Sequence, residues 1–243
     1  MNTVNSLGSS IGISEKTMHV VQGIKLNLPV ELLTPRIKTA IETQKYEHLE
    51  ARQLGRFLRD GDTLLEFGGG IGFISALAAK KASLNGCVVV EANPILIPVI
   101  EETHRLNKSE ATIINAVALS ETSPLWSRST DGLTAPFFVS ENFWESSLTH
   151  SSEYKSYHNI TMILTKDFIS NYKPTVIICD IEGGEIDIFE NTDLTTVRMA
   201  FFEVHKNLIG LTGINHLIRT LEAQGLYYDP DYSVGATVMF SRA

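Results

Sequence analysis

A glycine-rich turn spans residues 66–72, with the sequence EFGGGIG, between an apolar stretch and a run of small and apolar residues. Glycine lets the backbone turn tightly and lets a ligand approach it closely, so such a turn is typical of cofactor-binding folds. The glycines that define it are Gly68, Gly70 and Gly72, whereas a dinucleotide fingerprint would place its third glycine at Phe73. No Gly-Lys-Ser/Thr follows, which excludes a phosphate-binding P-loop.

The charge beside this turn indicates which cofactor it binds. Glu66 would repel a pyrophosphate but attract the ammonium and sulfonium groups of S-adenosylmethionine. Glu91 ends the next apolar run, at the spacing of about 20 residues where an acid accepts hydrogen bonds from ribose hydroxyls. A solvated acid stabilised by a helix N-terminus is the other interpretation of Glu91. Together the two acids favour S-adenosylmethionine.

A second group of polar residues follows two later apolar segments. Asp180 ends one and is followed by Glu182, while Glu203 and His205 end the other and lie two apart, on one face of an extended chain. Parallel strands would bring these residues to one sheet edge, where α/β folds bind ligands. They could deprotonate a substrate hydroxyl, with Asp180 or His205 as general base.

Two other uses of this group stay open. Asp180, Glu203 and His205 are acceptable ligands for a divalent cation, so a metal is a further hypothesis to which the sequence does not commit. Glu182 and Glu185 could instead cap a short helix expected at 185–190.

Apolar segments alternate with helical patterns over most of the chain. This alternation predicts an α/β fold, Rossmann-like, with a mostly parallel sheet and helices on both faces. The last two strands are separated by too few residues for a crossover helix, so they should form a C-terminal antiparallel hairpin. The expected strands are 63–67, 87–91, 111–114, 176–180, 199–204, 226–228 and 237–241, and the expected helices begin or lie at 72–80, 94–107 and 214–224.

The flanking segments differ from this pattern. Residues 1–58 are expected to form an N-terminal extension, with a hairpin over 17–28 that turns at Gln22-Gly23 and one helix over 35–58. Residues 59–243 would form the main domain. Residues 121–160 are expected to be a loop-rich insertion over the sheet edge, in which Asn142, Phe143 and Trp144 could form a substrate lid.

The motifs resemble those of the FkbM family of methyltransferases, over about residues 46–205. The similar segments are the glycine turn, Val90-Glu-Ala-Asn-Pro94, the Asp-x-Glu-Gly-x-Glu segment that runs from Asp180 to Glu185, Glu203-Val-His205, and Tyr46-Glu47 upstream. Glu66 and Gly69 depart from the residues usual in the family. The resemblance implies a class I methyltransferase fold, S-adenosylmethionine as cofactor, a cofactor contact at Asn93, and O-methylation of natural products and sugars.

Further positions and partners are expected more broadly. Asn115, after the third strand of the alternation, is a candidate contact near the adenine or a turn residue, and Asp180 could also contact the cofactor. The acceptor is expected to be a hydroxyl of a small molecule or sugar. Methylation of an amino group on a peptide or protein, and a cofactor-binding module without catalysis, are the alternatives.

The bulk composition limits the partners. A formal net charge of −8 and a pI near 5.4 argue against a nucleic-acid-binding surface. No signal peptide and no apolar run of about 20 residues is recognisable, so the sequence predicts a cytoplasmic protein without a membrane span. The chain could form a homodimer. Cys87 and Cys179 lie in apolar runs and are expected to be buried thiols.

Overall fold

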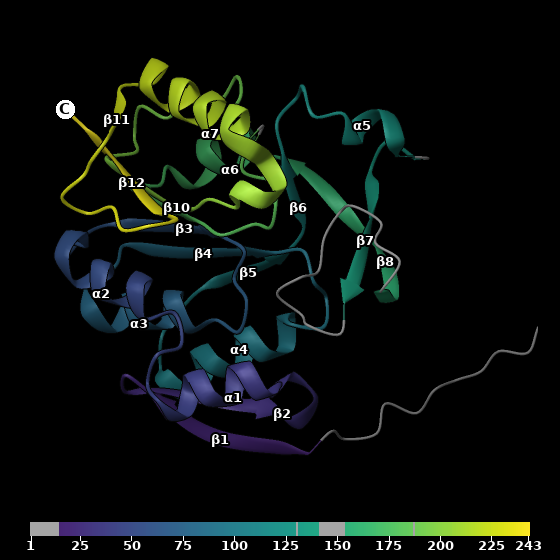
Figure 1. Ribbon diagram of the computed structural model, residues 1–243, viewed down its shortest axis with the longest axis vertical. Coiled ribbons are helices and arrows are strands. Elements are labelled where there is room, and N and C mark those ends of the chain that lie inside the picture. Colours follow the sequence, from purple (N-terminus) through teal and green to yellow (C-terminus); the bar gives the residue numbers. More distant parts are fainter. Residues whose placement is uncertain (1–14, 130, 141–153, 187) are drawn as a thin grey trace, which may run out of the picture.

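A central seven-stranded sheet organises the protein (Figure 1). The computed structural model describes residues 15–129, 131–140, 154–186 and 188–243. The strand order is β11-β12-β10-β9-β3-β4-β5. The strands are β3 (Thr63–Phe67), β4 (Gly86–Glu91), β5 (Thr112–Asn115), β9 (Val176–Cys179), β10 (Met199–Glu203), β11 (Leu226–Tyr228) and β12 (Thr237–Arg242).

The direction of these strands confirms the predicted fold class. The pairs β10–β9, β9–β3, β3–β4 and β4–β5 are parallel, whereas β12 is antiparallel to both β10 and β11. The C-terminal hairpin therefore closes a mostly parallel sheet, as in a class I methyltransferase. From β3 the sheet continues through β4 and β5 on one side and through β9 and β10 on the other. The carboxyl ends of β3 and β9 therefore mark a topological switch point, where such sheets bind ligands.

Helices cover both faces of the sheet, and the alternation along β3 shows why. Leu64 packs into a core cluster with α3 (Phe73–Lys81) and α4 (Ile97–Asn107). Leu65 and Phe67 point to the opposite face and pack with α6 (Thr165–Tyr172) and α7 (Lys206–Ala223). Figure 1 shows these two helix layers on either side of the sheet. Successive strand residues alternate between faces, so both faces need apolar cover.

The N-terminal hairpin packs on the outer side of α3 and α4. β1 (Lys16–Val21) and β2 (Ile24–Pro29) are antiparallel and turn at Gln22-Gly23, where φ is 47° and 80°. Two successive positive φ values are typical of a two-residue hairpin turn, so the predicted hairpin and its turn are confirmed. The buried residues of β2 belong to the same core cluster as α3 and α4.

The predicted helix over 35–58 is wrong in its middle. A short 3₁₀ helix (Val30–Leu32) precedes α1 (Pro35–Glu42), and α2 (His48–Phe57) follows after a break. Gln44 and Glu47 have φ of 59° and 43° at this break. The Gln44 side chain accepts a hydrogen bond from the Gln22 amide and donates one to the Val20 carbonyl. These two bonds hold the break against the hairpin. The break also places Tyr46 and Glu47 in the wall of the pocket described below.

A second, three-stranded sheet takes in part of the segment 121–160, which is predicted to be loop-rich. It has the order β6-β8-β7, formed by β6 (Val117–Leu119), β7 (Thr134–Ser140) and β8 (Tyr154–Leu164), with α5 (Leu125–Arg128) nearby. β7 alternates buried Ala135, Phe137 and Val139 with less buried residues, the pattern of a half-buried strand. The predicted lid residues Asn142, Phe143 and Trp144 lie outside the described residues.

The described residues of 185–190 do not form the helix predicted there. Residues 182–186 and 188–190 form turns. Gly183 has φ of 82°, and two successive glycines, Gly183-Gly184, disfavour a helix at this point. A capping role for Glu182 or Glu185 is therefore ruled out for a helix at that place.

Two smaller expectations concern the cysteines and the membrane. Cys87 and Cys179 are buried free thiols, as their apolar surroundings predict. Among the helices of the described residues, none combines the length and the apolar character needed to cross a bilayer.

Candidate functional site

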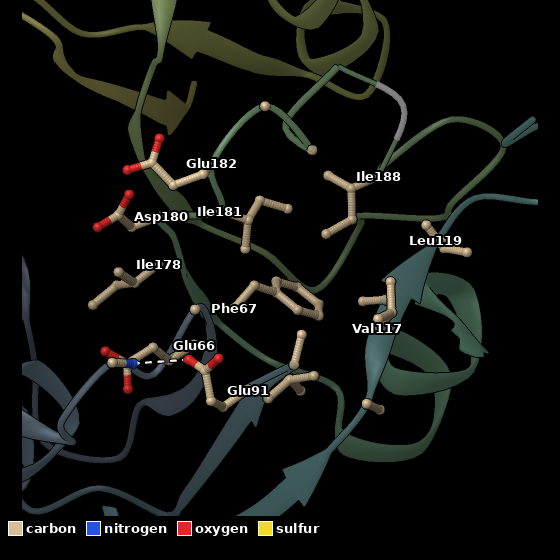
Figure 2. Close-up of a pocket in the computed structure, with 18 of the residues that line it drawn as sticks. Glu66, Phe67, Glu91, Val117, Leu119, Ile178, Asp180, Ile181, Glu182 and Ile188 are labelled. Carbon is tan, nitrogen blue, oxygen red and sulfur yellow. Dashed lines mark hydrogen bonds between the residues drawn. The ribbon is translucent and has the colours of Figure 1, made fainter. Parts of the chain in front are cut away.

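A cavity of about 560 Å³ lies at the carboxyl ends of β3, β4 and β9 (Figure 2). Its wall includes the glycine turn, the break before α2, the turn after β9 and parts of the second sheet. The acidic residues that line it are Glu47, Glu50, Glu66, Glu91, Asp180 and Glu182, and among the described residues no Lys, Arg or His lines this cavity.

The glycine turn forms the floor of this cavity. Gly68 has φ of 85°, and a Cβ there would lie 1.8 Å from the carbonyl oxygen of Asp180. Only glycine fits such a position. Gly70 has φ of 53° and a Cβ there would have no neighbour within 4 Å, because this glycine faces open space in the cavity. Gly72, with φ of 76°, packs against Ile100 and is the N-cap of α3.

Glu66 is a buried carboxyl that lacks a partner for one of its oxygens. It is 2% exposed, and Oε2 forms no hydrogen bond. Burial raises the pKa of Glu66 to about 8; a hydrogen bond from Ser75 opposes this, while Glu91 and Asp180 add to it. A buried acid without a partner is costly unless a ligand satisfies it, and a cation would do so. The site therefore fits a positively charged cofactor.

Glu91 stands beside Glu66 and holds the glycine turn. Its Oε2 accepts a hydrogen bond from the Gly70 amide at 3.0 Å, drawn as a dashed line in Figure 2. Its Oε1 accepts one from the Asn93 amide at 2.7 Å. Burial raises the pKa of Glu91 to about 7, against the effect of these backbone donors. The carboxylate thus spans the ends of β3 and β4.

Asn93 and Asn115 shape the backbone near Glu91. The Asn93 Oδ1 accepts from the Ile95 amide at 3.1 Å, and its buried Nδ2 has no partner. The Asn115 Nδ2 donates to the carbonyls of Glu91 and Ala92 at 2.8 and 3.0 Å. Both side chains fix the strand ends of the cofactor side, and a direct cofactor contact of either stays a prediction.

His205 lies among the acidic residues that follow β9. Its Nδ1 lies 2.5 Å from the Glu185 Oε1, and its Nε2 lies 3.3 Å from the Glu182 Oε2 and 3.7 Å from the Asp180 Oδ1. Burial disfavours the charged imidazole, but the bonds to Glu182 and Glu185 outweigh it and raise the pKa of His205 to about 10. At neutral pH this histidine is an imidazolium.

Asp180 faces the cavity from this group. Its side chain is 43% exposed to the open pocket, although protein atoms crowd it on the other sides. Desolvation by those atoms and the Glu203 carboxylate raise the pKa of Asp180 to about 8, while His205 acts in the opposite direction. Figure 2 shows Asp180 and Glu182 on the side of the pocket opposite Val117 and Leu119.

Asp180, Glu203 and His205 also lie close enough to share an ion. One ligand atom of each is within 4.8 Å of the others. Burial and Glu50 raise the pKa of Glu203. The predicted residues Asp180, Glu182, Glu203 and His205 are thus brought together as their strand-end positions imply.

The sequence motifs predict no role in the site for Glu185, Tyr46 and Glu47. Glu185 is completely buried and anchors His205. Burial also raises the pKa of Glu47 well above its usual range, against a hydrogen bond from Tyr46. The Tyr46 ring packs edge-on against Phe73 at 5.5 Å. The Tyr46-Glu47 pair is a recognisable signal, but its place in the pocket depends on the break before α2.

The remaining wall of the cavity is mostly apolar and comes largely from the second sheet. It includes Val117, Leu119, Leu125 and Phe137. Figure 2 shows Val117 and Leu119 together with Ile188 across the cavity from the acidic side. The pocket therefore pairs one charged wall with one apolar wall.

Comparisons with known proteins agree with the sequence motifs. The family model described as the Methyltransferase FkbM domain matches residues 66–226. No curated protein matches the chain significantly.

The similar solved structures share only a low sequence identity with the chain. One is a putative transferase from Pyrococcus horikoshii, at 16% identity, with 89% of this chain and 63% of that chain covered and a TM-score of 0.46. Another is Trm5b from Pyrococcus abyssi, at 15% identity, 94% and 56% coverage and a TM-score of 0.48. TYW2 from M. jannaschii in complex with AdoMet has 13% identity, 96% and 89% coverage and a TM-score of 0.46. The chain spans less than two thirds of the length of the first two.

Proposed function

Since the chain belongs to the FkbM family of methyltransferases, we propose that it transfers a methyl group from S-adenosylmethionine to a hydroxyl group of a small molecule, natural product or sugar. The single observation that carries the choice of a hydroxyl acceptor is Asp180: a pocket-facing carboxyl with a raised pKa, in the same cavity as the two acids of the cofactor side.

The cofactor side of the cavity fits the charges of S-adenosylmethionine. The free Oε2 of Glu66 can accept a hydrogen bond from the ammonium group, and Gly70 leaves the turn open for close approach. Glu91 stands at the end of β4, where an acid can bind the ribose hydroxyls. When bound, the cofactor would supply an activated methyl group on a cationic sulfur, and the neutral thioether of S-adenosylhomocysteine would be the leaving group.

The acceptor side supplies a base and a means to orient it. Removing the proton of a hydroxyl as it attacks contributes about 10²–10⁴-fold to the rate. Asp180 can accept that proton once it is ionised, whereas His205 already carries one. We therefore assign the base to Asp180. The imidazolium of His205, held by Glu182 and Glu185, orients Asp180 and stabilises its ionised form.

The apolar wall favours an acceptor with a nonpolar body. Val117, Leu119, Leu125 and Phe137 would remove water from the reacting groups when the site is filled. An acidic pocket also disfavours acceptors that carry phosphate or carboxylate groups near the hydroxyl.

The test measures S-adenosylhomocysteine formed from S-adenosylmethionine with panels of hydroxyl acceptors (phenols, sugars, polyols) and amine acceptors (lysine-containing peptides). We expect turnover with hydroxyl compounds, about 10²–10⁴-fold less turnover in Asp180→Asn at unchanged cofactor affinity, and full activity in Asp193→Asn, a surface control. Turnover confined to amines would contradict the hydroxyl proposal. Cofactor binding without turnover on any acceptor would favour a binding module, and loss of activity with EDTA would favour a metal at Asp180, Glu203 and His205.

A further inference from the structure

A chain of buried polar groups runs from the cofactor side of the cavity through the layer of α3 and α4. The Ser75 hydroxyl on α3 lies beside the Glu66 carboxyl and lowers its pKa. The Ser75 Oγ lies 3.1 Å from the His104 Nε2 on α4, and the His104 Nδ1 lies 2.9 Å from the Ser109 Oγ. Glu66, Ser75 and His104 are 2%, 0% and 4% exposed, whereas Ser109 is partly exposed.

The packing of α3 against α4 does not require these polar groups. Both helices pack through apolar residues such as Ile74, Leu77, Val99 and Ile100. Burying a serine and a histidine between them costs free energy unless every donor and acceptor is satisfied. The contacts of Ser75 with His104 and of His104 with Ser109 pair these groups in one connected chain, whose inner end lies beside Glu66.

The chain can be fully bonded in two directions. With Glu66 protonated, its O–H donates to Ser75, Ser75 donates to the His104 Nε2, and the Nδ1–H donates to Ser109. The Ser109 hydroxyl then donates to the His104 carbonyl, at 3.4 Å. With Glu66 ionised, Ser109 donates to Nδ1, the Nε2–H donates to Ser75, and Ser75 donates to the carboxylate. Neither direction leaves a ring nitrogen unpaired.

We propose that Ser75 and His104 are positioning residues for the cofactor carboxylate Glu66, and that His104 changes tautomer when Glu66 loses its proton to bind the cofactor. The proposal rests on the proposed function in one respect, that Glu66 faces the cofactor's ammonium group. In the change, the Glu66 proton passes to Ser75, the Ser75 proton to Nε2, the Nδ1 proton to Ser109, and one proton leaves Ser109 for water.

The neighbours of Glu66 make its charge sensitive to a ligand. Glu91 at the end of β4, Asp180 after β9, Tyr46 and Glu47 before α2, and Cys87 within β4 all interact with it electrostatically. None of these described neighbours is a cation, so a positively charged ligand would bring Glu66 a partner that they do not supply. Burial lowers the pKa of His104 to about 4. The ring is therefore neutral near pH 7 and can switch tautomer rather than charge.

The direct test is ¹⁵N NMR of the histidine rings in the full-length protein, with S-adenosylhomocysteine as the probe. We expect the Nδ1–H tautomer of His104 without ligand at pH 6 and the Nε2–H tautomer with saturating ligand. The ligand-free protein should show the same change as pH rises from 6 to 9.5. A single unchanged tautomer in both series would overturn the proposal. Calorimetry on the same sample separates this from the proposed function, since failure to bind the ligand would contradict only the latter.

Variants give a second readout. Ser75→Ala should weaken S-adenosylhomocysteine about tenfold at pH 7 and move the pH at which affinity rises to a higher value, because the ionised carboxylate loses a donor. Ser75→Thr retains the hydroxyl and should restore most of the affinity. Thr192→Val removes a buried hydroxyl bonded to the Glu190 carbonyl and serves as control, with no change expected. An affinity and pH profile equal to wild type in a folded Ser75→Ala protein would also overturn the proposal.

Discussion

The Nδ1 of His205 lies 2.5 Å from the Oε1 of Glu185, although the two residues are 20 positions apart in the chain. Glu185 is fully buried, and its second oxygen has no partner. Its carboxylate thus depends on His205 for its only hydrogen bond among the described residues. This pair ties the turn after β9 to the end of β10, and it leaves the Nε2 of His205 facing Glu182 and Asp180.

The first prediction concerns this pair and stability. His205→Gln leaves the Glu185 carboxylate buried without its counter-charge, which we expect to lower the free energy of unfolding by about 3–5 kcal/mol at pH 6. The folded-state pKa of His205 lies above its unfolded value of about 6.5. The advantage of the wild type should therefore be full below pH 6.5 and be lost as pH rises through 10.

Urea unfolding of both proteins at several pH values measures this difference. His216→Gln is the matched control, because His216 pairs with Glu190 at a more exposed position. A difference between wild type and His205→Gln that grows as pH rises would contradict the assignment of an imidazolium.

The second prediction concerns the pH dependence of turnover. A base must be ionised to accept a proton, and the pKa of Asp180 is raised to about 8. With cofactor saturating, kcat/KM for the acceptor should rise with pH and level off above about 8. Steady-state assays from pH 6 to 10 check the profile. In His205→Gln the Asp180 carboxylate loses its cation, so the rise should move to higher pH; an unmoved profile would argue against orientation of Asp180 by His205.

The third prediction concerns Glu91 and cofactor affinity. Glu91→Gln keeps the size of the side chain but removes the negative charge that accepts from the Gly70 and Asn93 amides. Hydrogen bonds to charged groups are worth about 1.5–3 kcal/mol, so S-adenosylhomocysteine should bind about 10–100-fold more weakly. Calorimetry measures the Kd. Glu101→Gln, an exposed acid on α4, should bind like wild type, and equal affinities in the two variants would remove Glu91 from the cofactor site.

The fourth prediction separates two glycines of the same turn. In Gly68→Ala the new Cβ would collide with the Asp180 carbonyl, so we expect little folded protein. In Gly70→Ala the Cβ meets no protein atom within 4 Å, and the positive φ costs only about 1–2 kcal/mol. That variant should fold, shown by circular dichroism and thermal unfolding, but bind the cofactor weakly because the methyl group projects into the cavity. Normal cofactor binding by Gly70→Ala would mean that the turn does not approach the cofactor.

Local sequence patterns predicted most strands of the main sheet, and they predicted the polar residues on the cofactor side and on the acceptor side of the pocket. Glu66 and Glu91 end neighbouring strands, and Asp180, Glu203 and His205 end two others, so the parallel order alone brings them to one edge. What could not be predicted depends on long-range contacts. Gln44 interrupts the helix predicted over 35–58 through its hydrogen bonds to the hairpin. The local sequence around Glu185 suggests a helix cap, because its partner His205 follows a different strand, β10.

The Ser75–His104 contact and the second sheet show the same limit. Each helix by itself has an ordinary sequence, and only the packing of α3 on α4 brings the two side chains together. β7 carries a clear strand alternation, but its serine- and threonine-rich neighbours obscured it, and its partner β8 follows after a long separation.

The second sheet meets the main one where β5 passes into β6, and β6 runs parallel to β8 with Val117 opposite Met162 and Leu119 opposite Leu164. The segment from Ser120 to Thr161 therefore leaves and re-enters the fold at neighbouring points. A segment with adjacent ends tolerates changes of length and sequence without disturbing the framework that carries it. The part of the apolar wall that this segment carries, Leu125 and Phe137, could therefore be exchanged as one unit while Val117, Leu119 and the acids of the cofactor side stay in place.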